Sequence, residues 1–328
     1  MYLSLILHPL DYSAGANPAL ARALALAKWH DAGLHVLHVR SRRRGIDGEE
    51  AAHARLREFV EARNPEAAKF EPVILAGDPV TAVADYARHK SPDLLVVDKH
   101  GRRASKLWRA GVFAKELARL VACPTLTVPD NHDVANSTAG TSFREILCAS
   151  DFSSASIAAL KQALVLAQQS GGRLTALHVL DGFPYETVYS SSRAFGVIDE
   201  YRGLVAQMSR QLRNAIPQDA VNWCEVQTRV VSGVPHRAIL STALEIKPDL
   251  IVMGLPARSA LDTVFMGSTT SPVLRGAQCP VLTVPVPANI ESQTLVTPSR
   301  APALDSDLYS MIPGRASQPT RIGGLASW

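Results

Sequence analysis

Short apolar runs alternate with amphipathic helical patterns along most of this 328-residue chain. The run LILHPL, at 5–10, has the length and the leucine-rich composition of a buried strand. The stretch 157–167 places Ile, Leu, Leu and Ala on one face of a helix, at spacings of three and four residues. Strands that alternate with helices in this way form parallel sheets covered on both faces, so the pattern predicts an α/β fold.

The same order of strands and helices occurs twice, in a first and a second repeat. The segment ILCASDFS in the second repeat matches LILHPLDYS in the first, and both end in Asp, an aromatic residue and Ser. His178 follows His38 by 140 residues in the second strands, whereas Gly254 follows Asp98 by 156 residues after the fourth strands. The second repeat therefore has 16 additional residues, and we expect 183–203 to contain much of that insertion.

The repeat predicts two tandem doubly wound, Rossmann-like domains, each with a five-stranded parallel sheet and helices on both faces. We expect domains at 1–130 and 142–287, joined by a linker of small and polar residues at 131–141. Residues 288–328 are rich in Pro, Ser and Gly, which predicts a disordered tail, with a short docking segment at Leu304–Ile312 as the alternative for part of it.

Composition restricts the classes of function. The net charge of +4 is too small to indicate a nucleic-acid-binding protein. The four cysteines have neither metal-ligand nor C-x-x-C spacing, which favours buried thiols in a reducing compartment. No apolar run approaches the length of a transmembrane helix, and the opening segment has the pattern of a first strand and not of a signal peptide. We therefore expect a cytoplasmic protein that binds neither membranes nor nucleic acid.

A glycine-bearing loop follows the fourth strand of the second repeat. The apolar run 250–253 leads into Gly254, then a polar loop, and then Gly267, Ser268 and Thr269 at the start of a helical pattern. Backbone N–H groups in such a loop point at an anion, and glycine lets the backbone approach phosphate oxygens closely. Two hydroxyls add further donors. The segment predicts a phosphate cradle, and simple turn glycines are the alternative.

This spacing resembles that of the universal stress protein family, whose nucleotide-binding members carry G-x2-G-x9-G-[ST] after the fourth strand. Gly254, Gly267 and Ser268 match the motif, whereas Ala257 stands in place of its second glycine. The segment CPVLTVP, which follows, resembles the last strand of the family. The resemblance implies that the second repeat binds ATP or AMP. A methyl group at position 257 weakens the cradle without abolishing it.

The resemblance also implies roles for residues at the ends of the first two strands. Asp151 would lie near the ribose or the base, and Val179 and Leu180 would contact adenine through their backbone. In doubly wound sheets, ligands bind outside the carboxyl ends of the strands where strand order reverses, which agrees with these positions. The alternative for Asp151 is a helix N-cap shared with Ser153.

The first repeat lacks several of these features. Asp98 stands where the second repeat has Gly254, and Val112 stands where it has Ser268. A carboxylate repels a triphosphate and valine offers no hydroxyl, so we do not expect this repeat to bind a nucleoside triphosphate in the manner of the family. Basic residues at Arg42–Arg44 and at 99–109 are either solvated charges or a subsite for another anion.

No nucleophile and general base occur together, and no P-loop is present, so we do not expect an enzyme. His38 and His178 are expected to be structural. One hypothesis is a tandem universal stress protein that binds an adenine nucleotide and acts as a stress-response sensor or regulator. The other is a scaffold of the same fold that binds no nucleotide and acts through self-association and protein partners. The resemblance implies pairing through the last strands, as an intramolecular pseudo-dimer or as a homodimer.

Overall fold

The computed structural model describes residues 2–12, 18–40, 48–63, 69–99, 112–130, 142–182, 194–256 and 268–286. All of them belong to one compact unit, Met1–Ile290. The expected linker 131–141 and tail 288–328 lie outside the described residues, as do Ala257, Gly267 and Arg42–Arg44.

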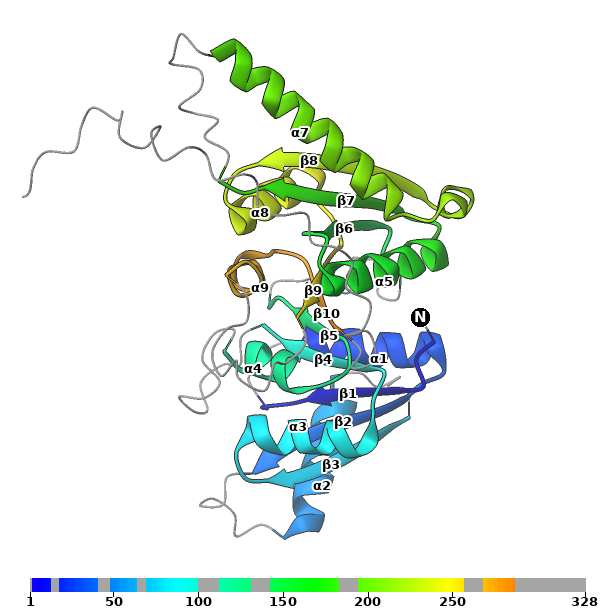
Figure 1. Ribbon diagram of the computed structural model, residues 1–328. Coiled ribbons are helices and arrows are strands. Elements are labelled where there is room, and N and C mark those ends of the chain that lie inside the picture. Colours follow the sequence, from blue (N-terminus) through cyan, green and yellow to red (C-terminus); the bar gives the residue numbers. More distant parts are fainter. Residues whose placement is uncertain are drawn as a thin grey trace, which may run out of the picture. The chain divides into compact units, whose positions relative to one another are not determined.

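The elements of the two repeats follow the predicted order (Figure 1). In the first repeat they are β1 Leu5–Pro9, α1 Pro18–His30, β2 Gly33–Arg40, α2 Glu49–Glu61, β3 Phe70–Ala76, α3 Pro79–Lys90, β4 Leu94–Asp98, α4 Val112–Leu120 and β5 Thr125–Val128. In the second they are β6 Glu145–Ala149, α5 Ser154–Ser170, β7 Arg173–Leu180, α7 Ala194–Asn214, η2 Gln218–Asn222, β8 Glu225–Ser232, α8 Pro235–Ile246, β9 Leu250–Leu255, α9 Thr270–Gly276 and β10 Val281–Pro285. Part of the insertion lengthens a helix, because α7 has 21 residues and its counterpart α2 has 13.

The ten strands form a single sheet in the order β3-β2-β1-β4-β5-β10-β9-β6-β7-β8. Within each repeat the strands are parallel, as predicted. Strand β10 pairs antiparallel with β5, with Leu282 opposite Leu126. The last strands therefore pair within the chain, as the resemblance implies, and this pairing joins the five-stranded sheets of the two repeats into one continuous sheet. The pairing satisfies the backbone groups of two strands that would otherwise be exposed edges.

The core lies on both faces of this sheet. Because side chains alternate along a strand, Ile6 packs under α1 and α2 while Leu7 packs under α3 and α4. On the face of α1 and α5, one apolar cluster continues through both repeats and includes Leu24 and Leu164. On the other face there are two clusters, one in each repeat, and Ala118 of α4 also contributes to the cluster of the second repeat. Burial of the α1 and α5 face thus joins the two repeats.

Candidate functional site

Three adjacent strands bring several of the predicted site residues to one edge of the sheet. Strand β6 lies between β7 and β9, so their carboxyl ends are neighbours. Asp151 follows the end of β6, Val179 and Leu180 end β7, and Gly254 is the next-to-last residue of β9. Ser268 and Thr269 directly precede α9, which connects this side of the sheet to the start of β10. Ala257 and Gly267 lie outside the described residues.

Asp151 positions the first turn of α5. Its Oδ1 accepts hydrogen bonds from Ser153 N at 3.0 Å and from Ser153 Oγ at 2.5 Å. Ser153 is itself the N-cap, because its Oγ accepts a bond from Ser156 N at 3.2 Å. Burial acts to raise the pKa of Asp151, but the bonds from Ser153 and Ser156 outweigh it and hold the pKa below its ordinary value. The side chain is exposed, so an ionised acceptor faces solvent at this edge.

Gly254 is required where β9 crosses the start of α5. A Cβ at this position would overlap the carbonyl group of Ala155 and would lie 2.6 Å from Ser156 N. Only glycine permits this approach, so the residue has a packing role besides any contact with phosphate. The equivalent residue of the first repeat is Asp98, which has a carboxylate side chain.

A stacked histidine and aromatic ring lie beside the site in both repeats. His178 Nδ1 donates to a backbone carbonyl at 2.8 Å, and its ring lies 4.5 Å from that of Phe152. His38 Nδ1 donates likewise at 3.0 Å, and its ring lies 4.2 Å from that of Tyr12. Burial lowers the pKa of both histidines, which favours their neutral form. These contacts support the structural role expected of both.

Phe152 and Tyr12 have φ of 64° and 55°. Sequence reasoning did not assign these two aromatic residues to the site. The Asp-aromatic-Ser sequence that occurs in both repeats is the signal that could have found them.

The basic residues of the first repeat are only partly described. Lys99 Nζ donates to the carbonyl oxygen of Ala277 at 2.8 Å, at the C-terminal end of α9 in the second repeat. Burial lowers the pKa of Lys99, although Asp130 opposes that shift. Lys99 therefore connects the two repeats instead of facing an anion subsite. The rest of the expected basic cluster, which is Arg42–Arg44, Arg102, Arg103 and Lys106, lies outside the described residues.

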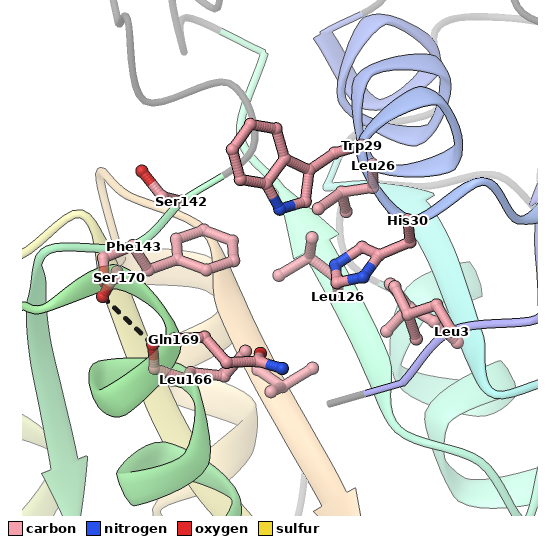
Figure 2. Close-up of a pocket in the computed structure, with 12 residues that line it drawn as sticks. Leu3, Leu26, Trp29, His30, Leu126, Ser142, Phe143, Leu166, Gln169 and Ser170 are labelled. Atoms are coloured by element: carbon pink, nitrogen blue, oxygen red, sulfur yellow. Dashed lines mark hydrogen bonds between the residues drawn. The ribbon is translucent and has the colours of Figure 1, made fainter. Parts of the chain in front are cut away.

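An apolar hollow lies at the junction of the repeats, away from the edge described above (Figure 2). Most of its lining comes in equivalent pairs, one residue from each repeat. The pairs are Leu3 and Phe143, Leu26 and Leu166, Trp29 and Gln169, His30 and Ser170, and Leu126 and Leu282. The hollow is thus a product of the pairing between β5 and β10 and contains no predicted site residue.

Comparison with known proteins decides the family. The sequence model of the Universal stress protein family matches residues 4–129 and, again, residues 142–285. The chain belongs to the universal stress protein family. Since both repeats match, this universal stress protein is a tandem member.

Individual relatives match one repeat at a time. Universal stress protein MJ0531 of Methanocaldococcus jannaschii is 28% identical over 146 residues, which are 44% of this chain and 84% of the relative. Universal stress protein YxiE of Bacillus subtilis is 33% identical over 150 residues, which are 43% of this chain and 99% of the relative.

A solved universal stress protein from Archaeoglobus fulgidus has the fold of both repeats. It superposes with a TM-score of 0.59 at 22% identity and covers 86% of this chain and 98% of its own. Within the part of this universal stress protein that the structure describes, no helix is both long and apolar enough to cross a membrane. The same residues contain no group of three or more potential metal ligands.

Proposed function

We propose that this tandem universal stress protein binds an adenine nucleotide, ATP or AMP, through its second repeat, as a stress-response sensor or regulator. The observation that carries the proposal is that Asp151 and Gly254 lie at the neighbouring carboxyl ends of β6 and β9. The Ser268–Thr269 pair directly precedes α9, the next described element after β9. This edge lies where strand order reverses, which is where doubly wound sheets bind ligands.

Different residues at this edge suit the nucleoside and the phosphates of a bound nucleotide. The ionised Asp151 is an acceptor for a ribose hydroxyl and would repel phosphate, so it belongs at the nucleoside end. The half-buried Val179 and Leu180 offer backbone groups and apolar side chains to the base. The phosphates are then assigned to the loop that begins at Gly254 and ends at Ser268 and Thr269, with Gly267 and Ala257 inside it.

A second candidate function is a scaffold that binds no nucleotide. It is favoured by the alanine at position 257, which costs about 1 kcal/mol if the family conformation needs positive φ there. It is also favoured by Asp98 and Val112 in the first repeat, which do not suit a phosphate. Both functions are binding functions, and neither assigns a catalytic residue to this chain.

Mass spectrometry of the purified protein for a co-purifying adenine nucleotide distinguishes the two functions. Calorimetry with ATP and with AMP then tests the site. Gly267→Val is expected to abolish binding, because a branched side chain would occupy the phosphate position. Ala257→Gly is expected to tighten binding about fivefold, the equivalent of about 1 kcal/mol.

The first repeat supplies the matched control. Gly111 is the equivalent of Gly267, so Gly111→Val should leave nucleotide affinity unchanged. Unchanged affinity in Gly267→Val would remove the site from the second repeat. Absence of binding to either nucleotide would favour the scaffold.

A further inference from the structure

The continuous sheet ends in two strands that occupy equivalent places in the repeats, β3 and β8 (Figure 1). Among the described residues, β3 pairs with β2 alone and β8 with β7 alone. Each strand therefore directs half of its backbone N–H and C=O groups away from the sheet. Such an edge is a template for pairing with another strand unless a residue on it prevents this.

The hydrogen bonds show which residues of β8 face outward. Glu225 N donates to Gly172 O at 3.2 Å, and Gly233 N donates to Leu180 O at 3.1 Å, both toward β7. Because successive residues of a strand direct their backbone groups to opposite sides, the even-numbered residues Val226, Thr228 and Val230 direct theirs outward.

The first repeat carries a proline at the matching outward position. Gly77 N donates to Arg40 O at 3.2 Å, toward β2, so Pro72 faces outward on β3. The sheet register places Pro72 beside Val36 and Thr228 beside Ala176, and these pairs are equivalent in the two repeats. Proline has no N–H, so it blocks the edge of β3, whereas β8 contains no proline.

Charged side chains cross the sheet in a row that reaches the open edge. Arg173 of β7 lies between Glu145 of β6 and Glu225 of β8 in the register. Its guanidinium contacts Glu145 Oε1 at 3.2 Å and Glu225 Oε2 at 2.9 Å. The signs alternate along the row and end on Glu225, whose side chain is 54% exposed. The next member of the row would be a cation.

We propose that β8 pairs antiparallel with β8 of a second molecule of this chain. With Gln227 opposite Gln227 of the second molecule, Val226 lies opposite Thr228, and both direct backbone groups outward as the hydrogen-bonded ladder requires. The same register places Glu225 of each molecule opposite Arg229 of the other, which gives two equivalent ion pairs. The row of alternating charges then continues across the interface.

Neighbouring registers lack this complementarity. A register centred on Thr228 places Arg229 opposite Gln227, and one centred on Val230 or Arg229 loses both ion pairs. Arg229 also contacts Glu245 of α8 at 2.6 Å in the same molecule, and both side chains are partly exposed. Arg229 is therefore held on the face of the sheet that α8 covers. In the proposed dimer, the side chain of Glu225 from the second molecule lies on the same face. Opposite charges directly across two strands stabilise the register, and like charges destabilise it.

Sedimentation of the full chain over a range of concentrations tests the proposal. We expect a reversible dimer, and we expect Thr228→Pro, which copies the first repeat, to make the protein monomeric. The fold should remain intact, because Thr228 N–H points away from β7, and circular dichroism with a thermal melt checks this. The matched control, Thr228→Val, keeps the N–H and should dimerise as the unmodified chain does.

Charge exchange tests the register independently of proline. Glu225→Arg and Arg229→Glu should each weaken dimerisation about tenfold, since each breaks two symmetry-related pairs, and the double substitution should restore it.

A third variant, Pro72→Thr, opens the edge of β3 and should produce larger assemblies. A chain that is monomeric at every concentration would overturn the proposal. So would a dimer unaffected by Thr228→Pro, because another surface would then hold it, and so would a β8 edge occupied by an unrelated extended peptide instead of a second molecule.

Discussion

Two equivalent aspartates differ in the direction in which their surroundings shift the pKa of the carboxyl group. Asp93 Oδ2 accepts bonds from Ser4 N at 2.8 Å, Ser4 Oγ at 2.7 Å and Leu5 N at 2.9 Å. Burial acts to raise the pKa of Asp93, but these bonds outweigh it and lower the pKa. Asp249 Oδ2 accepts a bond from Arg144 N at 2.7 Å. Arg144 replaces the serine, so no hydroxyl is available there, and burial raises the pKa of Asp249.

The first prediction concerns the pH dependence of stability through Asp93. A carboxyl whose pKa is lower in the folded state than its ordinary value of 3.8 stabilises the fold above that value. Asp93→Asn should therefore reduce the free energy of unfolding by about 1 kcal/mol at pH 7, because charge-assisted bonds at a partly exposed site are lost. The difference should diminish as the pH falls below 3.8.

Urea unfolding at pH 7 and at acidic pH measures this difference. Asp85→Asn is the control, since Asp85 contacts the exposed Arg88 on the surface of α3 at 2.8 Å and should change stability little. A deficit of equal size at both pH values would contradict the assigned role of the ionised carboxylate.

The ends of the elements repeat in backbone conformation as well as in sequence. The C-cap residues of helices α3 and α8 are Ser91 and Lys247, whose φ values are 47° and 50°. Glycines 77 and 233, which precede these helices, have φ of 126° and 137°. A left-handed residue ends each helix by directing its N–H to a carbonyl of the last turn, and a proline follows both. The two repeats thus use the same local devices although their side chains differ.

The second prediction separates the packing role of Gly254 from nucleotide binding. Gly254→Ala should lower the free energy of unfolding by about 1–3 kcal/mol without any ligand, because the added Cβ meets the backbone of α5 at Ala155 and Ser156. Thermal or urea unfolding of the ligand-free protein measures the loss.

Gly203→Ala is the matched control for this substitution. Gly203 lies inside α7 with no atom within 4 Å of an added Cβ, so alanine should stabilise the protein by about 0.5–1 kcal/mol. If Gly254→Ala were neutral, the close approach of β9 to α5 would not constrain this position.

At the scale of the whole molecule, a buried cation links the repeats. Arg22 of α1 is 1% exposed, and its guanidinium carbon lies 5.2 Å from the ring centroid of Phe143 in the second repeat. Burial lowers the pKa of Arg22, and the charge of Asp249 opposes that shift. The equivalent residue of the second repeat is the neutral Gln162. Arg22 therefore has no charged equivalent in the second repeat, and the junction departs from exact two-fold repetition there.

The third prediction is that Arg22 and Asp249 are energetically coupled. Arg22→Met should destabilise the protein by about 3 kcal/mol at pH 7, since it leaves a partly buried carboxylate without the opposing charge. Because the pKa of Asp249 is raised in the folded state, ionisation destabilises the fold as the pH rises, so the loss should shrink in acid. A double-mutant cycle with Asp249→Asn measures the coupling. Additive effects of the two substitutions would show that Arg22 acts through packing on Phe143 alone.

Much of this architecture was predictable from local pattern. Apolar periodicity depends only on which face of an element meets the core, so the strands, the helices and their repetition could be derived from the chain. The doubly wound rule then predicts that Asp151 and Gly254 lie at neighbouring strand ends, whereas Val179 follows from the family resemblance. The site assignment itself stays a prediction, because Ala257 and Gly267 lie outside the described residues.

Other features depend on contacts between residues far apart in the chain. The pattern of β5 and β10 indicates apolar strands, and their mutual pairing into one sheet came from the family resemblance and not from periodicity. Lys99 was assigned to a basic cluster, yet its partner, Ala277, is 178 residues away. The overlap that makes Gly254 necessary, and the outward direction of Thr228, likewise follow only from where neighbouring elements lie. Sequence by itself determined which faces are buried, whereas the tertiary structure decided which group each polar atom and each strand edge meets, because those partners are not local.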